Sequence, residues 1–385
     1  MMRQLTLALS LWPSWSFLAG VAGAVPIGGA LAALQLRNLR WVDVAFLPAY
    51  GALLVAHVDG GWDVLEVAKL LVGPVIYLYV RRVRLTGLST LLATLGVLFF
   101  GEAMLGRAIS DDLRSATFLT LEPSHSARAY YTVLFLWIVT TGRMRLPLAA
   151  AFAFVAFNVS LSSVVFTAFL TAFVSVRRIG VPHALRFFAA SGAALAILAG
   201  FITAFPDTRV ASAWERLGTA TTLARTDGAY AQVLFVAGGP RVAQSAAAFG
   251  TSSFWGYGLG YGANLRRHSE DTPFDLTEVP YIMRRPSAEP ASYLSQVAFE
   301  GGIVTALLLL AWFATVRPRG WRGGLTWAFA LVQLVVYSTT TMPTPWIFLA
   351  LAGRLDRNGI ALPPSPSDSS APGSPSRSTA AQVTP

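Results

Sequence analysis

Long apolar segments, separated by short polar ones, recur along nearly the whole chain of 385 residues. A helix needs about 20 apolar residues to cross a bilayer, and fewer when it is short and packed among neighbours. The first segment, 5–34, is too long for one helix, and because Pro13, Pro26 and Gly28-Gly29 interrupt it, we predict two short spans there. The whole pattern predicts about twelve spans. The others are centred in 42–57, 64–80, 85–105, 129–142, 146–160, 162–176, 185–205, 295–314, 323–340 and 343–353.

The composition agrees with this pattern. Hydrophobic residues make up 54% of the chain and charged residues 12%, and the mean hydropathy is +0.56. A chain of this length cannot hide so much apolar surface inside one soluble core. We therefore expect an all-α polytopic membrane protein. Because the chain contains no cysteine, its loops have neither disulfides nor thiolate chemistry.

Arginine clusters fall in alternate connections between the predicted spans, so all of them lie on one side of the membrane. By the positive-inside rule this side is the cytoplasm, and both termini lie there too. The formal net charge of +10 then reflects membrane topology and does not indicate nucleic-acid binding. The clusters are Arg37 and Arg40, Arg81, Arg82 and Arg84, Arg143 and Arg145, Arg177 and Arg178, Arg317, Arg319 and Arg322, and Arg354 and Arg357.

The same pattern divides the chain into four parts. Residues 1–204 hold nine predicted spans and a smaller outer loop at 106–128. Residues 205–294 form a large outer, periplasmic loop, and 295–355 hold the last three spans. The Pro/Ser-rich end, 356–385, lacks apolar periodicity and is predicted to be a disordered cytoplasmic tail. A loop as long as the large one is usually functional in a compact protein.

Helical composition recurs inside the large loop. The segments 211–222 and 227–236 are predicted to be helical. A clearer helix covers 241–249, because Pro240 suits its first turn and Gly250 suits its end.

This last helix is followed by FWGYGLGYGANLRRH, Phe254–His268. Gly258, Gly260 and Ala263 satisfy the pattern G-x-G-x-x-G/A. A dinucleotide site also needs a hydrophobic strand before the glycines and a helix after them. Here a helix precedes them and no helical pattern follows, so we reject a nucleotide loop. The structural alternative is a close-packed turn in which backbone approaches backbone.

A helix that carries Arg241, the G-x-G-x-G turn at 256–260, and a Y-L-x(5)-E-x-G-I entry into an apolar helix at 293–303 occur in this order. Together they resemble the O-antigen polymerase and O-antigen ligase superfamily, whose span layout and large outer loop are also similar. The resemblance implies glycosyl transfer at the outer face of a bacterial inner membrane. The donor would be an oligosaccharide on undecaprenyl diphosphate. The acceptor would be a second carrier-linked unit for a polymerase, or lipid A core for a ligase.

An enzyme that catalyses such a reaction must hold the diphosphate while the bond from the anomeric carbon to it breaks. The large loop contains arginines and no lysine, and arginine binds phosphate bidentately. Arg241 matches the family's arginine before the glycine turn, and we assign it a catalytic role. Structural pairing with the loop's acidic residues is the alternative for the other arginines. We assign substrate binding to Arg216, Arg225, Arg266, Arg267, Gly256, Gly258, Gly260 and Tyr293.

The reaction also needs a general base. The ligase branch of the family has a histidine in an H-N-x-Y-L pattern, whereas this chain reads E-P-A-S-Y-L. Glu289 is the acid nearest to that position, so we predict it as the base, followed by Asp271 and His268. An ion pair of Glu289 with Arg284 or Arg285 is the alternative. The missing histidine favours the polymerase branch.

Polar residues within the predicted spans support a different class, a lipid or polysaccharide transporter or flippase. These residues are Glu66, Lys69, Glu102 and Asn158. Because the chain shows no internal repeat, and its polar residues gather in one outer loop, we rank the transfer enzyme first. No spacing of residues predicts a metal site, and no cofactor is expected. The expected partners are undecaprenyl-diphosphate-linked oligosaccharides, membrane lipids, and chain-length regulator or flippase proteins.

Overall fold

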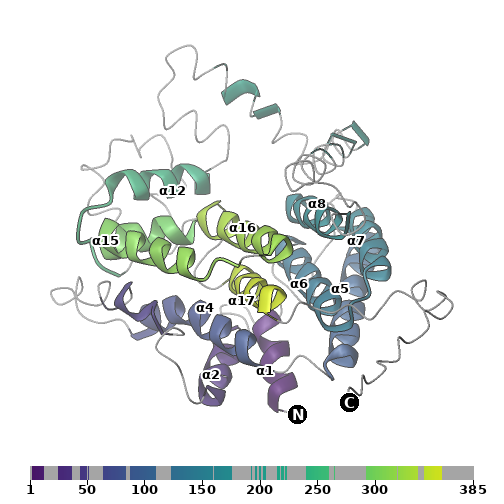
Figure 1. Cartoon of the computed structure of the whole chain (residues 1–385). Helices are drawn as coiled ribbons and strands as arrows, with labels where there is room; N and C mark the ends of the chain where they lie inside the picture. Colours follow the sequence, from purple (N-terminus) through teal and green to yellow (C-terminus); the bar gives the residue numbers. More distant parts are fainter. Residues whose placement is uncertain are drawn as a thin grey trace, which may run out of the picture.

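A computed structural model describes residues 2–12, 25–36, 44–49, 51, 64–83, 87–109, 123–158, 160–175, 240–259, 264, 292–318, 320–336 and 342–357, with single positions between 192 and 222. Every regular element among these residues is a helix, which confirms the all-α prediction for this part of the chain (Figure 1). The helices are α1 (Met2–Leu11), α2 (Val25–Gln35), α4 (Val64–Arg82), α5 (Ser89–Ile109), α6 (Pro123–Thr141), α7 (Arg145–Phe157), α8 (Leu161–Ser175), α12 (Pro240–Thr251), α15 (Tyr293–Thr315), α16 (Trp321–Val336) and α17 (Thr344–Arg357).

Two of the described helices, α5 and α15, are long and apolar enough to cross a membrane. Apolar helices too short to meet that test cover Arg145–Phe157 and Ser162–Val174. Most of the predicted spans at 185–205 and 42–57 lies outside the described residues, as do the tail from 358 on and most of the large loop.

The first apolar segment forms two antiparallel helices, as predicted, but one detail of the prediction was wrong. Pro26 and Gly28 lie inside α2 and do not break the chain. Pro26 is the second residue of α2, where no backbone donor is needed. Gly28 lets the two helices approach closely, because a Cβ on it would lie 2.6 Å from the backbone nitrogen of Ser10. The side-chain amide of Gln35 donates to the Thr6 hydroxyl at 2.6 Å and ties the far ends together.

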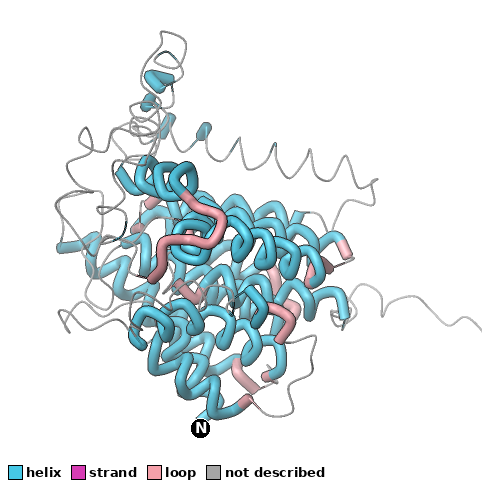
Figure 2. The backbone as a smooth tube through the Cα atoms, turned by 90° about the vertical axis from the view of Figure 1, so that its left-hand side faces the viewer, coloured by secondary structure: helices cyan, strands magenta, loops and turns pink. Residues whose placement is uncertain are grey.

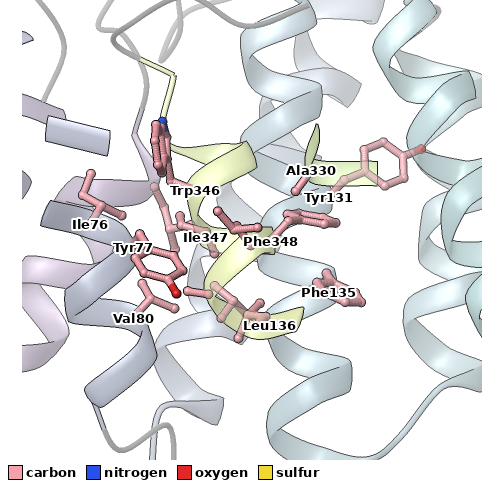
Figure 3. Packing of buried hydrophobic residues seen from close by; sticks show 14 of the residues in the cluster. Ile76, Tyr77, Val80, Tyr131, Phe135, Leu136, Ala330, Trp346, Ile347 and Phe348 are labelled. Carbon is pink, nitrogen blue, oxygen red and sulfur yellow. The ribbon is translucent and has the colours of Figure 1, made fainter. Parts of the chain in front are cut away.

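Helix α17 forms the centre of the bundle. In Figure 1, α16 and α17 lie between the group formed by α1, α2 and α4 and the group formed by α5 to α8. Figure 3 shows Trp346, Ile347 and Phe348 of α17 between residues of α4 and residues of α6. The rings of Phe348 and Phe135 stack with centroids 4.6 Å apart. Every residue from Trp346 to Ala352 is at most 2% exposed, so α17 is buried on all its faces.

The arginine-bearing ends of helices α4 and α17 lie at the same end of the bundle. Arg354, near the end of α17, donates from Nη1 to the carbonyl of Val80 in α4 at 2.8 Å. The hydroxyl of Tyr79, one residue earlier, donates to the carbonyl of Arg3 in α1 at 3.1 Å. The clusters at the ends of α4 and α17 therefore share one end of the bundle, as their place in alternate connections predicts. Their cytoplasmic location stays a prediction.

Candidate functional site

Helix α15 is interrupted at Gly302. This residue has φ 83° and ψ 169°, a backbone conformation that favours glycine and cannot continue a helix. The helix begins at an N-cap, because the Ser292 hydroxyl accepts from the amide of Ser295 at 3.0 Å. All residues from Tyr293 to Gly302 are buried. The first half of α15 is thus a short helix enclosed by protein, and the second half continues beyond the interruption.

The segment that follows α12 replaces the helical hydrogen bond lost at this interruption. In a continuous helix the amide of Ile303 would donate to the carbonyl of Phe299. Here the amide of Tyr257 donates to that carbonyl at 3.0 Å, and the Ile303 amide donates to the carbonyl of Ser253 at 3.0 Å. Figure 2 shows this loop leaving α12 and lying against α15. Each of the two segments therefore satisfies a backbone group that the other leaves open, as buried backbone requires.

Further hydrogen bonds fix the segment 253–259, which is called the glycine turn below. The amide of Gly258 donates to the carbonyl of Glu300 at 2.9 Å. Asn264 is 8% exposed, and its amide donates to the carbonyls of Tyr257, Gly258 and Leu259 at 2.9, 2.9 and 3.1 Å. The turn is consequently held from both sides, by α15 and by a single asparagine side chain.

Two glycines allow this contact because they face each other. Gly256 has φ 86°, and a Cβ on it would overlap the carbonyl of Glu300. A Cβ on Gly302 would overlap the carbonyl of Phe254. Gly258 also has positive φ, 92°, and is buried. The interpretation of these glycines as a close-packed turn is confirmed, while substrate contact by Gly256 and Gly258 stays a prediction.

A buried carboxylate lies on α15 at the same level as the turn. Glu300 is 0% exposed, and the amide nitrogen of Gln296, one helical turn earlier, lies 3.3 and 3.4 Å from its two carboxylate oxygens. The sequence analysis included Glu300 only as the acidic residue of the Y-L-x(5)-E-x-G-I motif and assigned it no role. The signal for its burial was a single acid within an otherwise apolar run, which in a membrane-crossing helix indicates a structural or functional role.

Two further polar contacts between buried residues involve α6. Glu102 is 3% exposed and accepts from the Ser126 hydroxyl at 2.7 Å. Arg128 is 6% exposed and donates from Nη1 to the sulfur of Met342 at 2.9 Å. The sequence placed Arg128 at the edge of the smaller outer loop, so its burial was missed. Asn158 is buried as well, at 0% exposed, and is the C-cap of α7.

The predicted site residues that the structure describes differ in where they lie and in how far they are buried. Arg241 is the second residue of α12, so the predicted helix at 241–249 is confirmed. Arg216 is exposed. Tyr293 is 0% exposed, with its hydroxyl 3.5 Å from the carbonyl of Leu70 and its ring edge-on to Trp346, so it packs α15 against α4 and α17. The residues that lie outside the described part are Arg225, Gly260, Arg266, Arg267, His268, Asp271, Arg284, Arg285 and Glu289.

Within the described residues, no group of three or more histidine, aspartate, glutamate or cysteine side chains could hold a metal ion. No protein-family model matches the chain, and no curated protein matches it either. In the described residues, the segment after α12 is hydrogen-bonded through its backbone to the apolar helix α15, beside the buried side chain of Glu300.

Proposed function

We propose that the chain is a multi-pass protein of the bacterial inner membrane, with about twelve spans and both termini in the cytoplasm. The exposure of α5 supports this proposal. Only 33% of its most apolar window is buried. Val97, Leu105 and Ile109 are 72%, 60% and 68% exposed. A core helix of a soluble protein would bury these side chains, whereas contact with lipid removes them from water.

Within this membrane setting we propose a polysaccharide polymerase that joins undecaprenyl-diphosphate-linked oligosaccharide units at the periplasmic face. The observation that carries the proposal is the mutual backbone attachment of the glycine turn and α15. Transfer between two lipid-linked substrates requires loop groups held at a fixed place relative to the membrane. The attachment supplies this constraint at the C-terminal end of α12. Arg241 lies on the same helix, about 15 Å away along its axis.

Arg241 is proposed to bind the diphosphate. Arg241 is the second residue of α12. A cation in the first turn of a helix is unfavourable against the helix dipole, so binding of an anion by Arg241 would offset this interaction. Arg216, Arg225, Arg266 and Arg267 are proposed to supply further bidentate contacts to the donor. No cofactor is assigned.

Glu289 is proposed as the general base that takes the proton of the attacking hydroxyl. In the sequence Glu289 lies three residues before Ser292, the N-cap of α15, the helix to which the glycine turn is bonded. The absence of the ligase histidine from this segment favours polymerization, and transfer of a finished polymer to lipid A core is the alternative.

Deletion of the gene in its host separates these two reactions. A polymerase deletion should leave single repeat units that still reach their final acceptor, with no long polymer. If full-length polymer instead accumulates on the carrier and none reaches lipid A core, the chain is a ligase. Both products are distinguished by electrophoresis of the extracted glycolipids.

Variants of the purified protein test the assigned residues. Arg241→Lys keeps the charge but loses the bidentate fork, so chain elongation of lipid-linked repeat units should fall strongly while the protein stays folded. Arg145→Lys, at an exposed position at the start of α7, is the matched control. Full activity of the Arg241 variant would remove it from the site. Glu289→Gln keeps the shape and removes the basicity, and wild-type chain length from it would direct attention to Asp271 or His268.

A transporter or flippase is the second candidate function. The observation that favours it is the interruption of α15 at Gly302. Interrupted helices form substrate sites in many transporters. Here, however, the Phe299 and Glu300 carbonyls and the Ile303 amide at the interruption are bonded to the glycine turn. Proteoliposomes loaded with a labelled lipid-linked oligosaccharide discriminate the two classes. An enzyme lengthens the glycan, whereas a flippase moves it between leaflets and leaves its length unchanged.

A further inference from the structure

Two large aromatic side chains on the glycine turn point out of the protein. Phe254 is 60% exposed and Trp255 is 64% exposed. Their rings form a T-shaped pair with centroids 4.8 Å apart and an interplanar angle of 88°. The turn that carries them is fixed by the hydrogen bonds to α15, so the pair is presented on a rigid backbone. Two adjacent aromatic rings exposed to this degree indicate an interaction surface.

The pair adjoins the place where α15 changes its surroundings. Every residue of α15 up to Gly302 is buried, whereas Ile303 is 43% exposed and Leu307 is 59% exposed. The Ile303 amide is bonded to the carbonyl of Ser253, the residue just before Phe254. The backbone that carries the aromatic pair is therefore bonded to α15 at the level where the exposed aliphatic side chains of α15 begin.

We propose that Phe254 and Trp255 insert into the outer leaflet at the boundary between headgroups and acyl chains. Tryptophan is enriched at this depth because its ring is apolar and its N–H can still reach water. The continuous exposed side of α15 gives the reason for lipid as the partner. The proposal rests on the membrane location proposed above. Its consequence is that the glycine turn, and with it α12, is held at the depth of lipid phosphates, where the diphosphate of a carrier-linked donor also lies.

The absence of native cysteine makes a direct test possible, because each single-cysteine variant has one labelling site. Phe254→Cys and Trp255→Cys of the full chain are labelled with bimane and reconstituted into phosphatidylcholine/phosphatidylglycerol vesicles. Fluorescence is then measured with nitroxide lipids labelled near the headgroup, with nitroxide lipids labelled at the acyl end, and with aqueous iodide. Leu307→Cys and Leu105→Cys are the lipid controls, and Arg145→Cys, which is exposed, is the aqueous control.

The expected result is a loss of fluorescence at both aromatic positions that is larger with the headgroup-level nitroxide than with the deep one. The label at 307 should respond more to the deep nitroxide. If iodide alone, or no quencher, affects the labels at 254 and 255 while 307 and 105 respond to lipid, the inserted pair is refuted and the proposed membrane location stands. If 307 and 105 also fail to respond to lipid, the membrane location itself is refuted. Folding of each variant is checked by gel filtration, and the two aromatic positions serve as independent tests.

Discussion

The two long apolar helices, α5 and α15, are alike in sequence and different in structure. They have 21 and 23 residues and mean hydropathies of 1.5 and 1.9 in their most apolar windows. Yet 33% of that window is buried in α5 and 61% in α15. Helix α5 is largely exposed, whereas α15 is interrupted at Gly302 and is hydrogen-bonded there to the glycine turn. Hydropathy therefore identifies helices that suit a membrane, but burial and backbone conformation identify the one that organises a site.

Their glycines show the same difference. A Cβ on Gly96 of α5 would make ordinary contact with Val133 at 3.7 Å, and a Cβ on Gly101 would meet nothing within 4 Å. A Cβ on Gly302 of α15 would overlap the backbone of the glycine turn. Gly96 and Gly101 of α5 are thus replaceable, whereas Gly302 of α15 is required.

The largest expected effect comes from Gly302→Ala. A left-handed φ costs an alanine about 1–3 kcal/mol. The overlap with the Phe254 carbonyl adds to this cost, because backbone atoms of the turn would have to shift to make room for the Cβ. We expect the turn to detach and activity to be lost. Unfolding by denaturant in mixed micelles, together with the elongation assay, measures both effects.

Gly96→Ala in α5 is the matched control, and it should retain activity and stability. Wild-type stability and activity of Gly302→Ala would show that the turn is not attached to α15 in the membrane. The distinction between the two helices would then have no basis.

The next effect tests burial. Leu309 of α15 is 1% exposed, and Leu105 of α5 is 60% exposed. Leu309→Ala should lower the free energy of unfolding by about 2–5 kcal/mol because it leaves a cavity. Leu105→Ala should change it by no more than about 0.5 kcal/mol. Equal losses of unfolding free energy in the two variants would contradict the description of α5 as an exposed helix and α15 as an enclosed one.

A smaller effect is expected at Asn264. Replacing it with alanine removes three hydrogen bonds to the turn and should cost about 1–3 kcal/mol, since one buried and two partly buried carbonyls lose a donor. Asn264→Asp should not restore stability, because an ionised carboxylate can only accept. Restoration by aspartate would mean that the side chain acts through its size and not as a donor.

The smallest effect has the opposite sign. Gly101 lies inside α5 with open space around its missing side chain. Gly101→Ala should therefore raise the free energy of unfolding by about 0.5–1 kcal/mol, because alanine favours the helix. A loss of stability would indicate that a neighbouring element needs this surface of α5.

Much of the helical pattern followed from local sequence. The predicted span at 85–105 corresponds to Ser89–Ile109, and the one at 295–314 corresponds to Tyr293–Thr315. The helix at 241–249 was predicted from Pro240, which fits the first turn. These predictions succeed because apolar periodicity and helix-terminal residues act on the backbone within a few positions.

The sequence by itself thus determined the all-helical class, the approximate ends of most described helices and the need for close backbone packing at the alternating glycines. Only the tertiary structure decided that α15 breaks at Gly302, because the groups that satisfy its open carbonyl and amide belong to Tyr257 and Ser253, far away in the chain. It also decided that Tyr293 is enclosed and that α17 is central. These properties depend on which neighbours surround a helix, and hydropathy scores apolar residues equally whether their neighbours are protein or lipid.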